Sequence, residues 1–418
     1  MADYERGVNL RNQLWRLLIM LLFVILGLVG CSRRALLSGV VVRPEVISPN
    51  ADGKEDVAEI KYMLSENASI SIYFLDKAGR RYDFRSDRRR SFAKQSYIAL
   101  FGGTIDGRLL PDGEYTCIVE AGTEGGRREK VEKKLTIQGG DPEYIEIRNL
   151  TVAPDVFTPN RDGIKDRVTI GYYLTREAAR VEVFLTDGAG NKYPVPEDKI
   201  REPGAKGNHE HDYDAGVDLG ATPPPDGIYT VWVIAEDAVG NRDVKKGSLT
   251  IEMGGVPLVG IVNRAAKWSR TVVPLGETLS FTCTVKNIGR VAVRTKGPPP
   301  GTTYTTSENF NLLSLTLGKA VGEDFYEEPG IFRLGVDFEG NTSGRPYPYR
   351  WQLGKDEELT VIDGERYLMP AQSVTVYGHI QIIDKPTKIA PYYWLGLLHE
   401  QVRWVEENVQ RTQISIGF

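Results

Sequence analysis

The chain has 418 residues, of which 41% are hydrophobic and 26% charged, and its 52 lysine and arginine residues nearly balance 56 aspartate and glutamate residues. A chain of this length predicts two to four domains. The formal net charge of −4 gives no support to a nucleic-acid-binding role, and three Cys and four His leave little material for a metalloenzyme or a disulfide-rich scaffold.

The N-terminal segment has the features of a secretory signal. Arg6, Arg11 and Arg16 precede an uncharged apolar run, Leu17–Gly30, which is shorter than the ~20 residues that a helix needs to cross a bilayer. The run leads into Leu28-Val29-Gly30-Cys31, which resembles the lipobox of bacterial lipoproteins. The resemblance implies a cleaved signal peptide over 1–30, a lipid on Cys31 and a linker over 31–40. The alternative is an uncleaved anchor in which Cys31 has no role.

Two copies of one unit follow. Pro49–Asp56 lines up with Pro159–Asp166, and Pro111–Thr116 lines up with Pro225–Thr230 at nearly the same spacing. Between these motifs apolar and polar residues alternate and Asp-Gly pairs mark turns, which is the pattern of half-buried antiparallel strands. We therefore expect two β-sandwich domains, a first repeat over 41–140 and a second repeat over 144–254.

The second repeat carries a specific resemblance. Its Phe157–Gly163 segment with Asp166, its Pro225–Thr230 segment and its Asp237–Asn241 segment resemble the immunoglobulin-like domains of the flagellar hook-assembly family and of bacterial surface and sorting modules. The resemblance implies an extracytoplasmic structural module with an immunoglobulin-like fold. The first repeat matches the pattern less well, with Ile47-Ser48-Pro49 at its start.

The shared Asn-x-Asp-Gly-x-x-Asp motif has two interpretations. Its carboxylate and amide oxygens could surround a calcium ion, which accepts six to eight oxygen ligands. The alternative is an Asx-type turn, in which Asn and Asp accept hydrogen bonds from their own backbone. The residues concerned are Asn50, Asp52 and Asp56 in the first repeat and Asn160, Asp162 and Asp166 in the second.

The third region, 256–418, keeps the β pattern without the repeat. Apolar and polar residues alternate along Leu279–Val285, and this strand with Pro274–Glu277 and Val285–Gly289 resembles cell-adhesion-related β-sandwiches of the CARDB kind. The resemblance implies a third sandwich. The expected fold class is thus all-β, with three tandem antiparallel sandwiches behind a hydrophobic signal segment.

An aromatic-rich insertion, about 297–353, interrupts the third region. Tyr347, Tyr349 and Trp351 in this insertion could contact a protein partner or stack on a glycan. In the other interpretation Tyr349 and Trp351, which are two residues apart, point to one face and close the end of the sandwich.

The remaining polar clusters suggest little chemistry. His209 and His211 would share a face of a strand but lack a third ligand, so the sequence predicts a solvated hairpin tip and no zinc site. His399-Glu400 is followed by Arg403 where a zincin helix needs His, and Cys117 and Cys283 lie at apolar strand positions expected to be buried. Arg88, Arg89 and Arg90 belong to a basic stretch that is either a solvated hairpin or a contact for an anionic surface.

These patterns predict a protein that binds and holds rather than an enzyme. The sequence predicts a lipid-anchored, extracytoplasmic structural or adhesive protein whose repeats act as spacers and protein-binding modules in a cell envelope. The expected partners are the membrane, through the N-terminal lipid, and an envelope protein or a glycan, with calcium as the one cofactor considered. The alternative function is a carbohydrate-binding or enzyme-accessory lipoprotein that uses the aromatic insertion.

Overall fold

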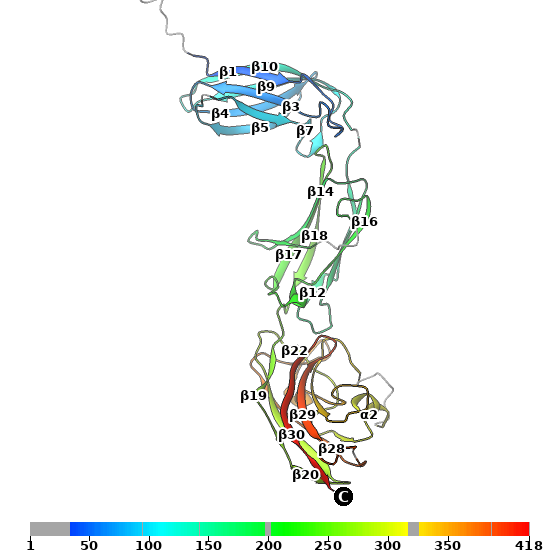
Figure 1. The fold of residues 1–418 in the computed structure, drawn as a ribbon. Helices are drawn as coiled ribbons and strands as arrows, with labels where there is room; N and C mark the ends of the chain where they lie inside the picture. The colour runs from blue at the N-terminus through cyan, green and yellow to red at the C-terminus, as the bar shows by residue number, and fades with distance from the viewer. Residues whose placement is uncertain are drawn as a thin grey trace, which may run out of the picture. The chain divides into compact units, whose positions relative to one another are not determined.

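The computed structural model describes residues 34–93, 95–141, 143–196, 202–316, 326–385 and 387–417 (Figure 1). Strands dominate these residues, and α2 (Phe310–Thr316) is the one α-helix among them, beside the short 3₁₀ turns η1 (Val217–Leu219) and η2 (Asp356–Glu358). The all-β fold class is confirmed. Among the described residues no helix has both the length and the apolar character to cross a membrane. The predicted signal peptide and Cys31 lie outside the described residues.

The first repeat forms two facing sheets. One has the strand order β1-β3-β6 and the other β2-β10-β9-β4-β5, so β5 and β6 are edge strands. All neighbours are antiparallel except β2 and β10, which run parallel. The bounds are β1 Leu37–Arg43, β2 Val46–Ile47, β3 Ala58–Leu64, β4 Ala68–Asp76, β5 Arg81–Arg90, β6 Tyr97–Phe101, β7 Thr104–Ile105, β8 Arg108–Leu109, β9 Gly113–Gly122 and β10 Arg128–Ile137.

The second repeat has the same topology. Its sheets have the orders β11-β13-β16 and β12-β18-β17-β14-β15, again with one short parallel pair, β12 and β18. The internal duplication of the sequence is therefore a duplication of strand order. The bounds are β11 Ile147–Ala153, β12 Val156–Phe157, β13 Val168–Leu174, β14 Arg180–Thr186, β15 Lys192–Pro194, β16 Gly207–Tyr213, β17 Gly227–Glu236 and β18 Arg242–Ile251.

The repeated Pro-Asp-Gly-x-Tyr-Thr motif fixes the entry to β9 and β17. The hydroxyl of Tyr115 donates to the carbonyl of Pro111 at 2.7 Å, and Tyr229 donates to Pro225 at 2.5 Å. The Asp112 carboxylate accepts the backbone N–H groups of the two glycines after β10 at 2.7 and 3.0 Å. These hydrogen bonds tie the end of β10 to the start of β9.

The third region builds two main sheets, of order β19-β21-β28-β23 and β25-β24-β29-β30, with smaller sheets β20-β31 and β22-β27-β26 beside them. We call this body the third sandwich. The bounds are β19 Val259–Trp268, β20 Val272–Pro274, β21 Thr278–Asn287, β22 Val293–Arg294, β23 Thr303–Thr305, β24 Phe332–Phe338, β25 Tyr349–Gln352, β26 Thr360–Ile362, β27 Glu365–Leu368, β28 Ser373–Gln381, β29 Tyr392–His399, β30 Arg403–Gln413 and β31 Ser415–Gly417.

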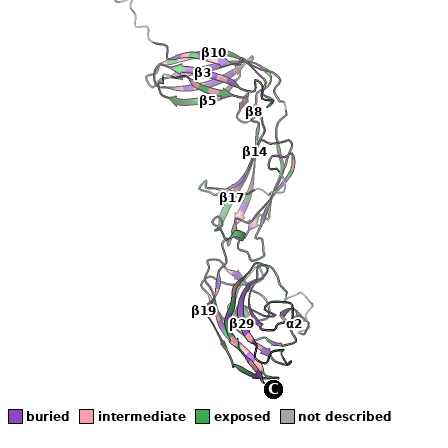
Figure 2. Ribbon diagram, in the orientation of Figure 1, coloured by how far each residue is buried: buried purple, intermediate pink, exposed green. Residues whose placement is uncertain are grey.

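Three separate hydrophobic clusters fill these bodies, one from Leu36 to Ile137, one from Ile145 to Ile251 and one from Val259 to Ile416. Buried and exposed residues alternate along most strands, as the period-two pattern requires (Figure 2). By compactness the chain divides into two units. The first holds the described residues up to Tyr144 with Glu236–Arg242, and the second holds Ile145–Ala235 and the described residues from Asp243 on.

The predicted linker over 31–40 is wrong in its second half. Leu36, Leu37 and Val40 belong to the core of the first repeat, and β1 already begins at Leu37. The backbone N–H of Leu36 donates to the Glu129 carboxylate at 2.6 Å. The sequence hid this strand because Gly39, at φ +61°, breaks the apolar alternation, and the pairing of β1 with β3 shifts register between Ser38 and Val41.

Candidate functional site

The Asn-x-Asp-Gly-x-x-Asp motif of the first repeat is an exposed turn that its own side chains cap. The Asp56 carboxylate accepts the backbone N–H groups of Asn50, Ala51 and Gly53 at 3.0, 2.8 and 2.7 Å. The side-chain oxygen of Asn50 accepts the N–H of Asp52. Burial acts to raise the pKa of Asp56, but these three N–H groups outweigh it and hold the pKa below its usual value.

The same turn of the second repeat makes the same bonds but is partly buried. Asp166 accepts the N–H groups of Asn160, Arg161 and Gly163, as Asp56 does in its turn. Asn160 and Asp162 are only 2% and 3% exposed. Burial, and then the charge of Asp162, raise the pKa of Asp166 to about 6 against the lowering effect of the N–H groups. Within the second unit, the third sandwich covers this turn.

Two side chains of the third sandwich end on the covered turn. The Tyr367 hydroxyl of β27 donates to Asp162 Oδ2 at 2.9 Å. The His399 ring at the end of β29 lies with Nε2 2.8 Å from the Arg161 carbonyl oxygen, so this nitrogen carries the proton and donates. We call this contact the turn junction, and we include in it Gly163 and Gly330, which flank the two hydrogen bonds.

Two glycines allow the backbones to meet at the turn junction. A Cβ on Gly163 would lie 2.3 Å from the Pro329 carbonyl oxygen, and a Cβ on Gly330 would lie 2.1 Å from the Asp162 carbonyl carbon. Both glycines also have φ near +83°, where other residues are strained. No side chain could be added at either position without separating the two bodies.

A buried ionic cluster supports the turn junction from inside the third sandwich. Glu400 accepts from Arg350 Nη1 at 2.9 and 2.8 Å and from Arg333 Nη1 at 3.1 Å. Arg333 is fully buried, while Arg350 and Glu400 are 3% and 4% exposed. The Phe310 ring of α2 lies 4.3 Å from the Arg350 guanidinium. Since a buried charge needs a partner, the cluster fixes the position of the chain next to His399.

Arg294 forms a second ionic contact beside the Gly163–Pro329 approach. Its guanidinium lies 2.8 Å from Glu328 and 3.8 Å from Glu365, and it donates to the Pro329 carbonyl at 3.0 Å. Arg294 is 3% exposed. It therefore holds the 328–330 segment against the covered turn.

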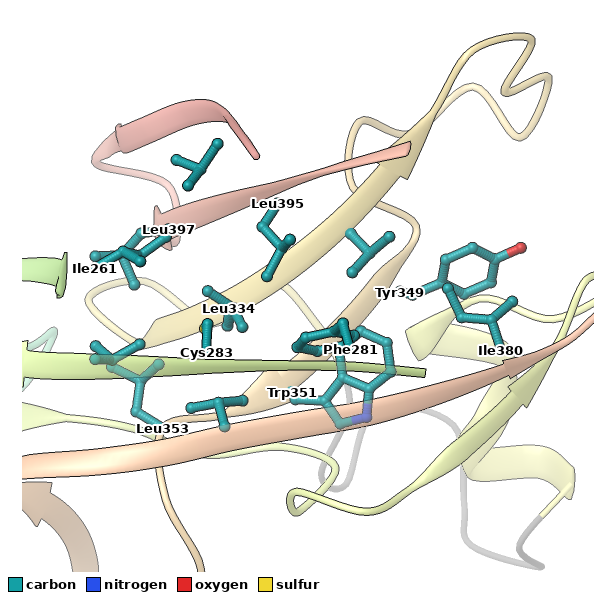
Figure 3. Packing of buried hydrophobic residues seen from close by; sticks show 14 of the residues in the cluster. Ile261, Phe281, Cys283, Leu334, Tyr349, Trp351, Leu353, Ile380, Leu395 and Leu397 are labelled. Carbon is teal, nitrogen blue, oxygen red and sulfur yellow. The ribbon is translucent and has the colours of Figure 1, made fainter. Parts of the chain in front are cut away.

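The predicted contact surface at Tyr347, Tyr349 and Trp351 is wrong, because all three residues are buried. Trp351 is fully buried between Phe281 and Tyr304, with ring centroids 4.8 and 5.0 Å away, and Tyr349 is in the same core (Figure 3). Trp351 Nε1 donates to the Thr302 carbonyl at 3.1 Å. Of the two interpretations, the structure supports packing within the sandwich and leaves these rings unable to stack on a glycan.

The expected solvated hairpin tip at His209 and His211 is also wrong. Both residues lie on β16 with their rings facing inward, stacked on Tyr172 at centroid distances of 5.1 and 5.6 Å. His209 Nε2 lies 2.6 Å from the Ala205 carbonyl. His211 contacts the Tyr172 hydroxyl and the Pro196 carbonyl. Stacking and backbone hydrogen bonds thus satisfy both rings as core residues.

The remaining predicted positions are placed as follows. Arg88, Arg89 and Arg90 are exposed at the end of edge strand β5. Cys117 and Cys283 are buried free thiols, as predicted, and burial raises the pKa of each to about 12. Among the described residues no group of three or more His, Cys, Asp or Glu side chains is arranged to hold a metal ion.

Sequence reasoning missed the turn junction and the Glu400 cluster. Arg350 stands between two core aromatics on a strand, a position that alternation assigns to the surface, and its partner Glu400 is distant in sequence. One signal was present. An acidic residue directly after an apolar strand, as Glu400 is after Leu395–His399, needs either solvent or a cation.

The chain is similar to several solved structures. No protein-family model and no curated protein matches it. Similar solved structures include a tetra-tandem repeat from the extending region of a large adhesion protein, with 14% identity, coverage of 91% of this chain and 74% of the other, and a TM-score of 0.22. A Ca²⁺-stabilised adhesin with which an Antarctic bacterium binds ice is 13% identical over 91% of this chain and 73% of its own, also with a TM-score of 0.22.

A glycan-binding protein is among the similar structures too. The Bacteroides ovatus protein SGBP-B, solved with a mixed-linkage heptasaccharide, is 10% identical, with coverage of 90% of this chain and 70% of its own and a TM-score of 0.14. At these scores the similarities carry no argument about function. The function proposed below therefore rests on this chain's own residues.

Proposed function

We propose that this chain is a lipid-anchored, extracytoplasmic structural or adhesive protein that acts by binding and holding rather than by catalysis. In this proposal Cys31 carries the lipid, the two repeats serve as spacers, and the third sandwich meets an envelope or surface partner. The observation that carries the proposal is the turn junction, in which a turn of the second repeat is capped by Tyr367 and His399 of the third sandwich.

The turn junction suits a spacer better than a flexible linker would. A spacer that presents a binding domain must keep the orientation of that domain and resist force along the chain. Buried hydrogen bonds such as Tyr367–Asp162 and backbones in contact at Gly163 and Gly330 resist separation, because opening them leaves polar groups without partners. A Gly/Ser-rich tether would instead allow free rotation.

The sequence of the first 31 residues supports the anchor. The small residue Gly30 directly precedes Cys31, after a basic and then an apolar segment. Several acyl chains on one terminus bind a bilayer far more firmly than one chain does. Attachment at Cys31 would place the first repeat, whose β1 begins at Leu37, close to the membrane.

The anchor is tested by expressing the full chain and a Cys31→Ser variant with a labelled fatty acid. We expect label and membrane flotation for the wild-type chain and neither label nor signal cleavage for the variant. Equal labelling of both chains would reject Cys31 as the acylated residue.

The holding role is tested by cross-linking intact cells that express the full chain. We expect an envelope protein or polymer cross-linked to the third sandwich, and loss of this product in a Gly163→Val variant that still folds and still reaches the membrane. An unchanged product in that variant would show that the turn junction has no part in presentation. A matched control is Gly53→Val, the same turn position in the exposed first repeat.

A further inference from the structure

One end of the first repeat, where the described part of the chain begins at Arg34, carries basic and aromatic residues. The described residues 65–67 after β3, 91–93 after β5 and 123–127 between β9 and β10 lie there. Arg34 and Ala35 line one recess there together with Phe92 and Met63. We call this end of the first repeat the entry end.

The first described residue is fixed to the entry end. Arg127 Nη2 donates to the Arg34 carbonyl at 2.7 Å, while Arg127 Nη1 binds Glu66 at 2.9 Å. Cys31 is therefore separated from the folded body by three peptide steps, which span at most about 11 Å when fully extended. A lipid on Cys31 would bring the entry end to the bilayer surface.

The surface of the entry end suits an anionic interface. A groove with a volume of about 800 Å³ lies there, lined by residues that include Asn67, Arg89, Arg90 and Phe92. Phe92 is 51% exposed, and its backbone N–H donates to Asn67 Oδ1 at 2.7 Å, so this position presents an apolar ring to solvent. Rings of this kind insert at the boundary between headgroups and acyl chains.

The entry end carries an excess of positive charge, which is opposite in sign to an anionic lipid surface. Arg89 lies 3.5 Å from Glu124, and Arg127 is neutralised by Glu66. Arg90 lines the groove, Arg34 lines the neighbouring recess, and Arg88 is exposed close by on β5, so that these three residues add positive charge to the entry end. Each basic residue near an anionic leaflet strengthens attachment by roughly fivefold.

We propose that the entry end docks, through Phe92 and its surrounding arginines, on the anionic lipid surface in which Cys31 is anchored. This inference rests on the proposed lipid anchor and adds a second contact to it. Acyl chains alone would leave the first repeat free to tilt, whereas docking of the entry end sets its direction from the membrane.

The test uses the full, processed chain in nanodiscs with an environment-sensitive dye at one of two introduced thiols. Gly125→Cys reports from the entry end, and Lys54→Cys reports from the opposite end of the same sandwich, in the exposed turn between β2 and β3. Cys117 and Cys283 are buried and stay unlabelled. We expect a blue-shifted emission at residue 125 in phosphatidylglycerol-containing discs, a smaller shift in pure phosphatidylcholine discs, and none at residue 54.

Variants separate docking from anchoring. Arg89→Ser with Arg90→Ser, and separately Phe92→Ala, should remove most of the shift at residue 125 without changing the thermal midpoint. Lys133→Ser with Lys134→Ser removes the same charge from exposed positions on β10 and should leave the shift intact. Raised salt should reduce the shift, since screening shortens the range of the attraction.

The outcomes differ for the two proposals. If the chain is acylated but the dyes at residues 125 and 54 respond alike, or respond alike to both lipids, docking is rejected and the anchor stands. If Cys31 instead reacts with the dye and the chain does not enter discs, the anchor fails and docking fails with it.

Discussion

Tyr367 and His399 are two side chains of the third sandwich that end on one turn of the second repeat. Each satisfies a polar group that burial has removed from water: a carboxylate oxygen of Asp162 and the carbonyl of Arg161. Such single bonds contribute about 1 kcal/mol when made, and their loss costs more because the partner stays buried.

Tyr367→Phe tests the first of these bonds. We expect the variant to lower the free energy of unfolding of the second unit by about 1 to 3 kcal/mol, because Asp162 Oδ2 loses its hydroxyl donor while buried. Chemical denaturation followed by tryptophan fluorescence measures the change. Tyr392→Phe, at a half-buried position on β29, is the control and should change stability much less.

His399 makes stability depend on pH. Burial lowers its pKa from 6.5 to about 4, so the folded state holds the ring neutral while the unfolded chain takes up a proton below pH 6.5. The neutral ring therefore contributes up to ~3 kcal/mol to the free energy of unfolding above pH 6.5. This stabilisation is lost as the pH falls from 6.5 through about 4. His399→Gln keeps an N–H donor but cannot titrate, so its stability should fall less between pH 7 and pH 4.

The stability of the wild-type protein must be compared with that of His399→Gln at each pH, because Asp166 changes stability with pH in the opposite direction. Its folded pKa is raised to about 6, so its contribution favours the folded state at low pH and is lost as the pH rises through 6. Parallel stability profiles of wild type and His399→Gln would contradict the assignment of the acid sensitivity to His399.

Substitution of Trp351 tests whether this side chain serves the hydrophobic core or binds a ligand. Trp351→Ala should destabilise the third sandwich by about 3 to 5 kcal/mol, because it empties the space between Phe281 and Tyr304. Trp404→Ala, at a position 44% exposed, should cost far less. A stable Trp351→Ala variant that had lost glycan binding would restore the rejected interpretation.

At the scale of elements, the repeated turn is a capped loop whose carboxylate oxygens already accept backbone N–H groups. Asp56 accepts three backbone N–H groups and Asp166 accepts four, and both carboxylate oxygens of each residue are engaged. This pattern stabilises the turn without a cation. It is the second of the two interpretations of the motif.

Removal of divalent metal tests the calcium alternative. We expect excess chelator to leave every thermal transition of the full chain unchanged, because the turn oxygens are held by N–H donors. The measurement is calorimetry with and without added calcium after chelation. A midpoint that falls with chelator, recovers with calcium and no longer responds in an Asp166→Asn variant would establish a calcium site in the second repeat.

Local pattern predicted the elements well. The alternation at Leu279–Val285 lies in β21, and the Pro-Asp-Gly-x-Tyr motif gave both repeats, because strands and turns follow from spacing within a few residues. What could not be predicted depends on partners far along the chain. No residue near Asp162 in the sequence indicates that Tyr367 is its partner, and alternation alone cannot show that both faces of β25 are buried.

At the scale of the molecule, the second unit should behave as one cooperative body across the turn junction. Asp162→Ala removes the acceptor for Tyr367 and leaves the Ile164 N–H without its acceptor, so we expect the melting transition of the second unit to broaden or split. Asp52→Ala makes the same change in the exposed turn of the first repeat and should cost less than about 1 kcal/mol. Similar effects of the two variants would contradict the coupling.

The contrast between the two turns makes the repeats unequal as building blocks. The turn of the first repeat is exposed to water and needs no other domain, whereas the turn of the second repeat contacts the third sandwich through Asp162 and Gly163. An engineer who wished to lengthen the chain should therefore insert copies of the first repeat and keep a single copy of the second beside the third sandwich. Gene duplication would face the same rule, since an added second repeat would expose a surface adapted to a missing neighbour.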